Sequence, residues 1–277
     1  GPPGTVTYNG DQGQRLVTIS PERQIAISDS GSDLFQRIKN GNGTFVTAPA
    51  TANTGTGIVS PGVALDVAKW NASAKDYTIK FNVSATVPPV TTYDILNAAG
   101  TLSMITGATP VAPAPRPYTS GQSISFTGLA GSPSDYGIDL NITGSPADGD
   151  TFTVKASTNQ DMFKTLNDLI ATLQSPVNTA ADRAKLANGL NAGMSNLALA
   201  LDNVLTIRAS VGSRLKEIDA VKSAGEDLSL QYQQTISQLQ DLDYAKAISD
   251  LTRQQTSLEA AMKSFLKIQG LSLFGMM

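Results

Sequence analysis

The chain contains neither cysteine nor histidine among its 277 residues. Without cysteine it can form no disulfide bond, no thiolate zinc site and no iron–sulfur cluster, and it has no thiol nucleophile. Without histidine it lacks a Ser-His-Asp triad, an imidazole metal ligand and a base that titrates near neutral pH. The sequence therefore predicts a protein that is not an enzyme and has no metal and no cofactor, although catalysis by carboxylates or lysine alone stays open.

Charged side chains are also scarce, at 16% of the residues, and the net charge is only −3. Such a balance predicts no general attraction to nucleic acid or to an anionic membrane. No apolar run approaches the ~20 residues of a membrane-spanning helix. With 40% hydrophobic residues the chain can build a core, and its length allows one large domain or two.

The composition changes near residue 160. Of the 24 glycines, 18 precede this point, and of the 14 prolines, 13 precede it, with only Pro176 beyond. Glycine and proline interrupt helices and are typical of turns between short strands. The first part is therefore expected to consist of strands and turns, and the second part of helices.

The start of the chain predicts a hairpin followed by a short helix. The first four residues, Gly1-Pro2-Pro3-Gly4, are typical of the remnant of a protease site and are left out of the fold. Residues 14–19 and 24–27 alternate apolar and polar side chains on either side of a turn, which predicts a β-hairpin. Residues 33–38 are expected to form a short helical turn.

Residues 46–156 are rich in Gly, Pro, Thr and Ser and contain short alternating segments. This pattern predicts a small antiparallel β domain with Trp70 in its core. The proline-rich residues 111–117 are expected to form a loop or an extended edge, because proline cannot donate a hydrogen bond to a sheet. The clearest strand candidates are residues 77–81, 123–126, 137–142 and 151–154.

Beyond residue 159 the apolar pattern takes the period of a helix. Residues 162–173 predict an amphipathic helix that Asn159 caps and that Pro176 stops. Its buried face is expected to consist of Phe163, Leu166, Leu169, Ile170 and Leu173.

A second helix, starting near Thr179, carries the strongest pattern in the sequence. Ten positions follow one another at alternating spacings of four and three, and eight of them are apolar, which is typical of a coiled-coil seam. A helix of this kind is stabilised mainly by packing, so the seam requires partner helices along its whole length, roughly 50 Å. The apolar seam consists of Leu190, Met194, Leu197, Leu201, Val204, Arg208, Val211, Leu215, Ile218 and Lys222.

The apolar pattern changes phase at residues 241–244, and the last stretch is again amphipathic. Because no other segment of the chain is left to cover this stretch, we expect its apolar side to contact neighbouring subunits. The terminal stripe, the predicted assembly surface of residues 241–277, consists of Tyr244, Ile248, Leu251, Leu258, Phe265, Ile268, Leu273 and Phe274.

Two segments of these helices are specific enough to indicate a family. Arg208-Ala-Ser-Val-Gly-Ser-Arg-Leu215, followed by Gln240-Asp-Leu-Asp-Tyr-Ala245, is similar to the C-terminal region of the flagellin superfamily. The ending Gln269-Gly-Leu-Ser-Leu-Phe274 and the opening Asn9-Gly-Asp11 resemble the hook-associated proteins of the hook–filament junction more than flagellin itself.

This resemblance implies an α+β fold, with long C-terminal coiled-coil-like helices, a β-hairpin and an inserted antiparallel β domain. It implies a structural protein of the bacterial flagellum, secreted through the flagellar type III apparatus and located outside the cell. Its partners would be other copies of itself, the preceding hook-associated protein, flagellin and an export chaperone, with no nucleic acid and no membrane. Subunits of this kind form an adaptor ring between hook-associated protein and filament.

The resemblance also assigns the parts of the chain. Residues 5–45 would supply the hairpin and short helix of a rod domain, residues 46–156 an outer domain, residues 157–240 the rod helices and residues 241–277 the terminal assembly helix. Members of the family begin with long N-terminal helices, and this sequence has none. We therefore expect an N-terminally shortened chain, which agrees with the uncovered seam.

Two other functions stay open. The chain could be a flagellin filament subunit, or a secreted adhesin in which residues 46–156 bind carbohydrate and the helices form a stalk. Carboxylate pairs such as Asp148 with Asp150, or Asp135 with Asp139, could in principle act as glycosidase acids. They lie in turns and strands without a scaffold that forms a cleft, so we favour structural roles for them.

Three charged features have competing interpretations. Asp241 and Asp243 could begin a metal site, but helical residues two apart do not face each other. Asp29 lies in a sequence that resembles a calcium loop but lacks the closing glutamate. Arg208 and Lys222 either select the register of a partner helix or pack their stems while the charged heads reach water.

Overall fold

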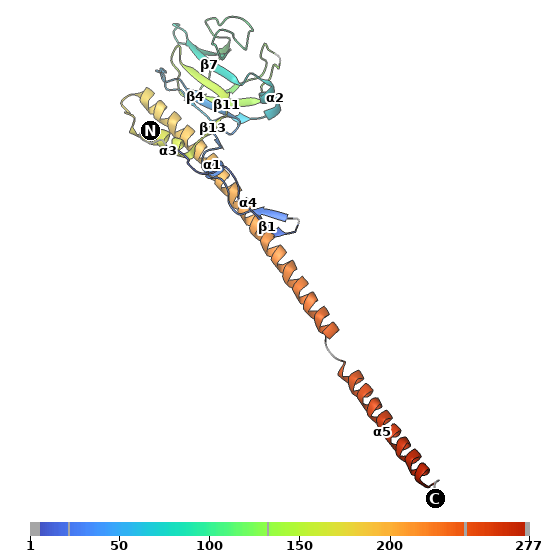
Figure 1. Cartoon of the computed structure of the whole chain (residues 1–277). Coiled ribbons are helices and arrows are strands. Elements are labelled where there is room, and N and C mark those ends of the chain that lie inside the picture. Colours follow the sequence, from blue (N-terminus) through green and yellow to red (C-terminus); the bar gives the residue numbers. More distant parts are fainter. Residues whose placement is uncertain (1–5, 22, 132, 241–242, 275–277) are drawn as a thin grey trace. The chain divides into compact units, whose positions relative to one another are not determined.

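The computed structural model describes residues 6–274 except residues 22, 132, 241 and 242, with side chains described up to residue 270 (Figure 1). The protease remnant predicted at residues 1–4 and the first half of the predicted phase change lie outside these residues. The chain divides into two compact units, Gly1–Leu215 and Lys216–Met277. It combines antiparallel sheets with long C-terminal helices, so the predicted α+β class is confirmed. In the described part of the chain, no helix has the length and apolar character that crossing a membrane requires.

The β domain consists of two antiparallel sheets around one core. The larger sheet has the order β4-β12-β7-β8-β9, and in the smaller one β11 pairs with β10, β5 and β6. Its core holds Trp70, as predicted, which is 1% exposed and lies between the rings of Phe45 and Tyr77. The bounds are β4 Phe45–Pro49, β5 Ile58–Val59, β6 Val63–Ala64, α2 Val67–Ala72, β7 Asp76–Val83, β8 Thr91–Asn97, β9 Arg116–Pro117, β10 Ser123–Ser125, β11 Ile138–Thr143 and β12 Thr151–Ala156.

All four strands predicted in this domain are present, as β7, β10, β11 and β12. The proline-rich residues 111–117 end in β9, which pairs only with β8 at the edge of the larger sheet, as predicted. The sequence pattern did not reveal β4 and β8. Strand β8 is buried on both faces, so its side chains do not alternate between apolar and polar.

The N-terminal segment forms the predicted hairpin from β1 (Leu16–Ser20) and β2 (Arg23–Ala26). Helix α1 (Gly31–Phe35) follows, but it ends earlier than predicted, and Ile38 belongs to strand β3 (Ile38–Lys39). Strand β3 pairs with β13 (Asn159–Gln160), so the chain enters and leaves the β domain at one short ladder.

Helix α3 (Met162–Gln174) begins with a different cap from the one predicted. Asn159 lies in β13, and the carboxylate of Asp161 accepts hydrogen bonds from the backbone N–H groups of Phe163 and Lys164, at 2.6 and 3.3 Å. The predicted buried face is also partly wrong, because Leu166, Ile170 and Leu173 are exposed and only Thr165 is fully buried.

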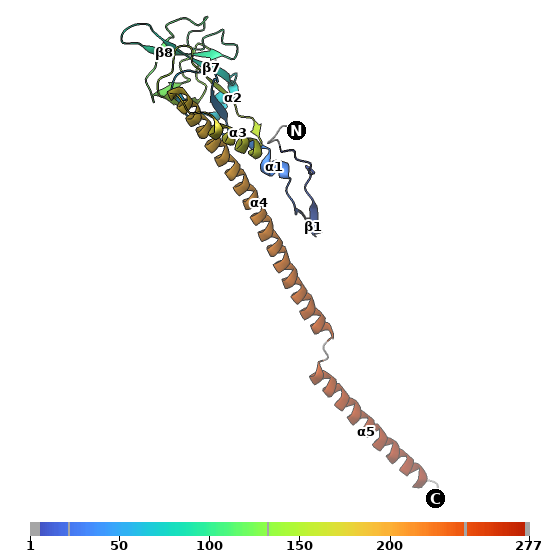
Figure 2. The ribbon, with the colours of Figure 1, turned by 90° about the vertical axis from the view of Figure 1, so that its left-hand side faces the viewer.

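Helix α4 (Ala180–Gln240) begins where the sequence predicted and continues without a break for 61 residues. A capping box starts it: the backbone N–H of Thr179 donates to the carboxylate of Asp182, and the N–H of Asp182 donates to the hydroxyl of Thr179. Figure 2 shows α3 lying along the first part of α4. In the second unit, α5 (Tyr244–Phe274) begins after residue 243.

Candidate assembly surface

Polar side chains on one side of α4 form hydrogen bonds with the rest of the first unit. We call this set the polar face of α4: Asn188, Ser195, Asn196, Asn203 and Arg214. Residues advance by about 100° each along a helix, so the centre of the polar face lies about 140° round α4 from the centre of the apolar seam. The two surfaces can therefore act independently.

Asn188 joins α4 to the β domain. Its Oδ1 accepts a hydrogen bond from the N–H of Val59 at 2.8 Å, and its Nδ2 donates to the carbonyl of Gly57 at 2.9 Å. The same Nδ2 donates to the carbonyl of Ala184 one turn earlier in α4, at 2.9 Å. Asn188 is buried, so these bonds satisfy polar groups that would otherwise be costly to bury.

The next contacts along the polar face hold the segment before the β domain. The N–H of Gly41 donates to Oδ1 of Asn196 at 2.8 Å, and the hydroxyl of Ser195 donates to the carbonyl of Gly41 at 2.5 Å. Nδ2 of Asn203 donates to the carbonyls of Asp33 and Leu34, both at 2.9 Å, at the end of α1. These groups bind main-chain atoms, which fixes the path of the chain along α4.

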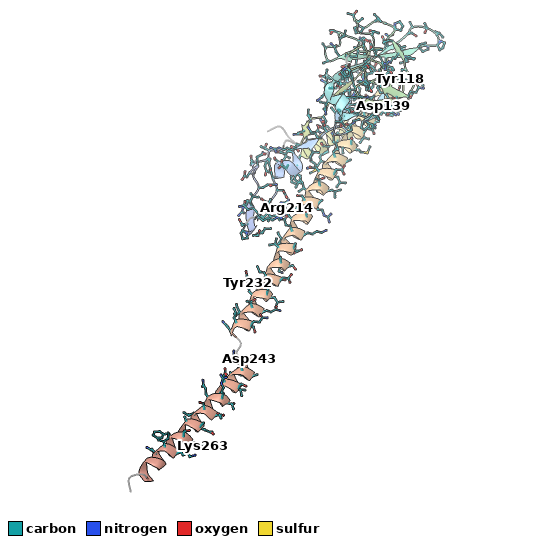
Figure 3. All side chains as sticks on the ribbon, turned by 90° about the vertical axis from the view of Figure 1, so that its right-hand side faces the viewer. Tyr118, Asp139, Arg214, Tyr232, Asp243 and Lys263 are labelled. Carbon is teal, nitrogen blue, oxygen red and sulfur yellow. The ribbon has the colours of Figure 1, made fainter. Side chains whose placement is uncertain are left out.

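Arg214 holds the N-terminal hairpin on α4. It donates from Nη1 to the carbonyl of Ala26 at 2.8 Å, and its Nη2 forms an ion pair with Asp29 (Figure 3). The two side chains are only 16% and 22% exposed, so this pair is screened less than a surface pair. Asp29, considered above as part of a calcium loop, thus has an ionic partner of its own.

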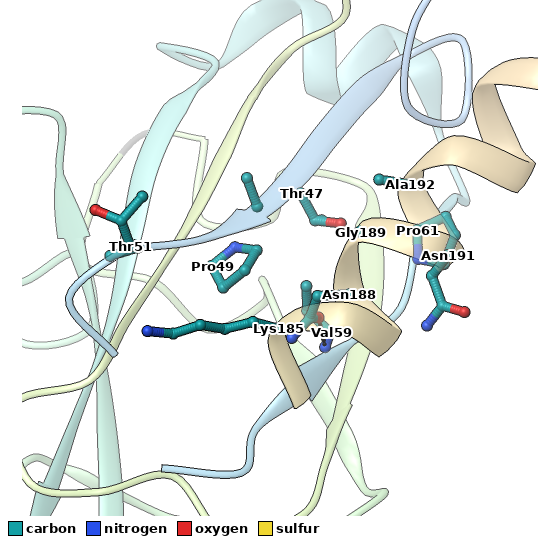
Figure 4. A pocket seen from close by; sticks show the side chains of 12 residues that line it. Thr47, Pro49, Thr51, Val59, Pro61, Lys185, Asn188, Gly189, Asn191 and Ala192 are labelled. Carbon is teal, nitrogen blue, oxygen red and sulfur yellow. Dashed lines mark hydrogen bonds between the residues drawn. The ribbon is translucent and has the colours of Figure 1, made fainter. Parts of the chain in front are cut away.

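A cavity of about 450 Å³ lies beside Asn188, between α4 and strands β4 and β5 (Figure 4). Pro49, Val59 and Pro61 line its β-domain side, and Lys185 and Ala192 line its helix side. Since the cavity adjoins the polar face, it is separate from the apolar seam.

The apolar seam itself is largely uncovered. Met194, Leu201, Val211, Leu215 and Ile218 are exposed, with Leu201 at 58%. Leu190, Leu197 and Val204 are half-buried and Arg208 is exposed, while Lys222 forms an ion pair with Glu226 at 3.8 Å along the same helix. The structure thus places the predicted seam residues on one side of α4 and leaves that side open.

Helix α3 packs against α4 at two glycines, beside the N-terminal part of the apolar seam. A Cβ added to Gly189 would lie 2.4 Å from Cγ2 of Thr172, and one added to Gly193 would lie 2.8 Å from Cδ1 of Leu169. Small residues four apart therefore let the two helices approach closely. The paired positions show that α3 runs antiparallel to α4.

The second unit exposes the terminal stripe along α5. Tyr244, Ile248, Leu251, Leu258, Phe265 and Ile268 are all exposed, with Leu258 at 60%. The side chains of Leu273 and Phe274 lie outside the described residues. The last part of α4 also exposes apolar residues, among them Leu228, Tyr232 and Leu239.

The candidate carboxylates have structural partners. Asp148 accepts from the backbone of Val83, and Asp150 accepts from three backbone N–H groups of turns. Asp135 pairs with Lys69 at 2.6 Å, which holds the pKa of Asp135 below its usual range, and Asp139 accepts from a serine. Among the described residues no three acidic side chains gather as metal ligands. These contacts give each of the four carboxylates a role in its turn or sheet.

Sequence reasoning missed the polar face. Apart from the neighbours Ser195 and Asn196, its members lie two or three turns apart. Asn, Ser and Arg away from an apolar seam are also what a solvated helix face contains. The signal that the sequence offered was the three amides Asn188, Asn196 and Asn203 on one side of a long helix.

A long helix that binds its own domain on one side and exposes an apolar seam on the other is typical of structural proteins that assemble through helices. Comparisons with known proteins agree with this class. No protein-family model matches the chain. Flagellar hook-associated protein 3 of Escherichia coli strain K12 is 40% identical over 115 residues, which cover 41% of this chain and 36% of that protein. The same protein of Salmonella typhimurium is 37% identical over 119 residues, 42% of this chain and 37% of the relative.

Solved structures match more of the chain. Flagellar hook associated protein-3 of Legionella pneumophila superposes with a TM-score of 0.72 at 25% identity, covering 85% of this chain and 67% of that one. FlgL of Xanthomonas campestris gives a TM-score of 0.67 at 29% identity, covering 85% and 68%. The sequence matches span little more than a third of the length of the curated relatives. The chain is thus similar to flagellar hook-associated protein 3 in sequence and in fold, and the predicted resemblance is confirmed.

Proposed function

We propose that this chain is a structural subunit of the bacterial flagellum, located outside the cell, that joins a preceding hook-associated protein to the flagellin filament. The observation that carries the proposal is the open apolar seam of α4, in a chain that is 40% identical over 115 residues to flagellar hook-associated protein 3 of E. coli. The role requires no catalysis. It depends on helix surfaces that are completed when subunits assemble.

The geometry of α3 and α4 supports a further helix that covers the N-terminal part of the apolar seam. Helix α3 contacts α4 through Leu169 and Thr172, and its exposed residues Leu166, Ile170 and Leu173 lie about a quarter turn away. Because α3 and α4 run antiparallel, these exposed residues of α3 and the exposed seam of α4 lie on the same side of the helix pair. The two helices thus form the walls of an apolar groove, and we propose that long N-terminal helices of the complete protein occupy it.

Among the described residues of the second unit, the terminal stripe of α5 has no groove partner of this kind. We propose that it packs against other copies of the chain, the preceding hook-associated protein and flagellin, and that an export chaperone covers it before secretion through the type III apparatus. The β domain, held on α4 by Asn188 of the polar face, would then face outward. If the subunits assemble through their helices, neither sheet of the β domain needs to contact another subunit.

Complementation of motility with charged variants of the full-length protein tests these surfaces. Leu201→Glu in the seam and Leu258→Glu in the terminal stripe should each abolish filament growth in a strain that lacks the junction protein. Both side chains are exposed, at 58% and 60%, so the substitutions cost the free chain little stability. Ala209→Glu and Ser257→Glu, exposed on other sides of the same helices, are the matched controls and should restore growth.

Normal filaments from both surface variants would contradict the proposed role of the seam and stripe. A strain that lacks flagellin tests the alternative function of a flagellin filament subunit. If the unaltered protein restored filaments in that strain, it would be a filament subunit. Specific sugar binding by the chain on a glycan array, together with failed complementation, would favour the adhesin.

A further inference from the structure

Four asparagine residues of the chain are followed directly by glycine: Asn9, Asn40, Asn42 and Asn188. In an Asn-Gly pair the backbone nitrogen of glycine can attack the side-chain carbonyl of asparagine, because glycine has no side chain to hinder the approach. The attack needs a glycine N–H that can lose its proton and an asparagine amide that can turn towards it. The fold therefore decides which of the four pairs can react.

The pair Asn40-Gly41 is held on both sides of this reaction. Oδ1 of Asn40 accepts a hydrogen bond from the N–H of Thr158 at 2.8 Å, and its Nδ2 donates to the hydroxyl of the same residue at 3.3 Å. The N–H of Gly41 donates to Oδ1 of Asn196 at 2.8 Å. The amide is thus fixed away from Gly41, and an N–H that donates a hydrogen bond gives up its proton less readily.

Asn42 and Asn188 are also held by the fold. Oδ1 of Asn42 accepts from the N–H of Phe45 at 2.9 Å, and the N–H of Gly43 donates to a carbonyl at 3.1 Å. Asn188 is buried, with its amide bound to β5, and Gly189 lies inside α4, where each N–H donates to the carbonyl four residues earlier. Each of these pairs must open locally before it can react.

Asn9 differs in both respects. Asn9 and Gly10 are exposed, and among the described residues neither the side chain of Asn9 nor the N–H of Gly10 takes part in a hydrogen bond. The contacts of this segment belong to Tyr8, whose hydroxyl donates to the carbonyl of Asp11 at 2.8 Å and accepts from the N–H of Gly31 at 3.2 Å. Water and base therefore reach the pair Asn9-Gly10 without any opening of the fold.

We propose that Asn9 is a site of spontaneous covalent modification in the folded chain, where it converts to aspartate and isoaspartate. The nitrogen of Gly10 loses its proton to base and forms a bond to Cγ of Asn9, and the side-chain nitrogen leaves as ammonia. The product is a five-membered succinimide ring, which one water molecule opens at either of its two carbonyl carbons. One opening gives aspartate, and the other gives isoaspartate, whose main chain runs through the former side chain.

The isoaspartate form changes the path of the chain as well as its charge. It adds one methylene to the main chain between Tyr8 and Gly10. A Cβ added to Gly10 would lie 2.4 Å from Cζ of Tyr8, so the tyrosine ring lies directly against this glycine. The longer main chain displaces the ring and weakens the hydrogen bond of its hydroxyl with the N–H of Gly31, at the start of α1.

Peptide mapping of the whole chain tests the proposal. Trypsin separates the sites into peptides 1–15, 40–69 and 186–208, since each is bounded by lysine or arginine. The folded chain is kept at mildly alkaline pH and sampled over time, and mass spectrometry follows the replacement of each amide by a carboxyl group. We expect Asn9 to convert about tenfold faster or more than each of the other three sites, because those sites must first open.

Two controls separate the fold from the local sequence. In the chain unfolded by urea all four pairs lose their contacts, so they should convert at similar rates. Asn9→Gln keeps an exposed amide but would have to close a less favourable six-membered ring, so peptide 1–15 should stay unconverted. In the isoaspartate form the N–H of Gly31 should exchange faster with solvent, whereas Asn9→Asp, which adds the charge without the methylene, should leave it unchanged.

The proposal is overturned if Asn9 converts no faster than Asn40 in the folded chain. It is also overturned if the unfolded chain shows the same preference for Asn9, because the local sequence would then account for it. Unchanged exchange at Gly31 in the isoaspartate form would refute the displacement of Tyr8.

Discussion

Asn188 offers the sharpest test of how α4 holds the β domain. In Asn188→Ala the N–H of Val59 and the carbonyl of Gly57 lose their partners, and both groups are in the buried contact between α4 and β5. Each buried polar group left without a partner costs about 1–3 kcal/mol, and water from the adjacent cavity can reach part of the site. We therefore expect the free energy of unfolding of the first unit to fall by about 2–4 kcal/mol.

The chain's single tryptophan makes the measurement specific. Trp70 is 1% exposed in the core of the β domain, so its fluorescence during urea unfolding follows that domain, whereas circular dichroism is dominated by the helices. The fluorescence midpoint should move to lower urea in Asn188→Ala. The matched control is Asn191→Ala, since Asn191 lines the same cavity and its side chain forms no hydrogen bond within the described structure.

Two outcomes would refute this reasoning. The first is a fluorescence midpoint for Asn188→Ala that equals that of the unaltered chain. The second is an equal loss of stability in Asn191→Ala, which would mean that any truncation at the cavity matters and that the hydrogen bonds of Asn188 do not.

Two further predictions concern the ends and glycines of α4. Gly189→Ala should destabilise the chain by about 1–2 kcal/mol, because the added Cβ would lie 2.4 Å from Thr172. Gly212→Ala, whose added Cβ meets nothing within 4 Å, should instead stabilise the chain by up to about 1 kcal/mol. Thermal unfolding should show a lower midpoint for the first variant and a higher one for the second, and shifts in the same direction would contradict the packing of α3. Hydrogen bonding to Thr179 lowers the pKa of Asp182, so its stabilising effect is present above the unfolded-state pKa of about 3.9 and is lost as the pH falls through the lower folded-state value. Asp182→Asn should therefore speed amide exchange in the first turn of α4 at pH 7 and reduce the acid dependence of unfolding there; an unchanged dependence would show that the capping box contributes nothing.

The parts of the fold that the sequence predicted are those in which apolar spacing decides the outcome. The seam of α4, the hairpin and four strands of the β domain follow directly from periods of 3.5 and 2. The exposed residues of α3 show the limit: the period identified an apolar face, but only the approach at Gly189 and Gly193 determines which part of that face contacts α4.

Other features depend on contacts between distant segments and could not be predicted. Asn159 is a good helix cap by composition, yet pairing with Lys39 in β3 draws it into a strand, and Asp161 caps the helix instead. Strand β8 escaped notice because Asp94 interrupts its apolar run, and only the folded domain shows that this carboxylate is buried. The open seam was predicted, but its role in assembly and that of the terminal stripe stay predictions.

The polar face of α4 has a consequence for which substitutions the protein tolerates. Nearly all its bonds end on main-chain atoms, those of Ala26, Asp33, Leu34 and Val59 among them. Any side chain that keeps the same backbone path can replace such a partner without loss of the bond, whereas the amides and the guanidinium on α4 have no such freedom. Sequence divergence should therefore be one-sided. The outer domain and hairpin can diverge in sequence while the helix that carries them keeps its polar residues.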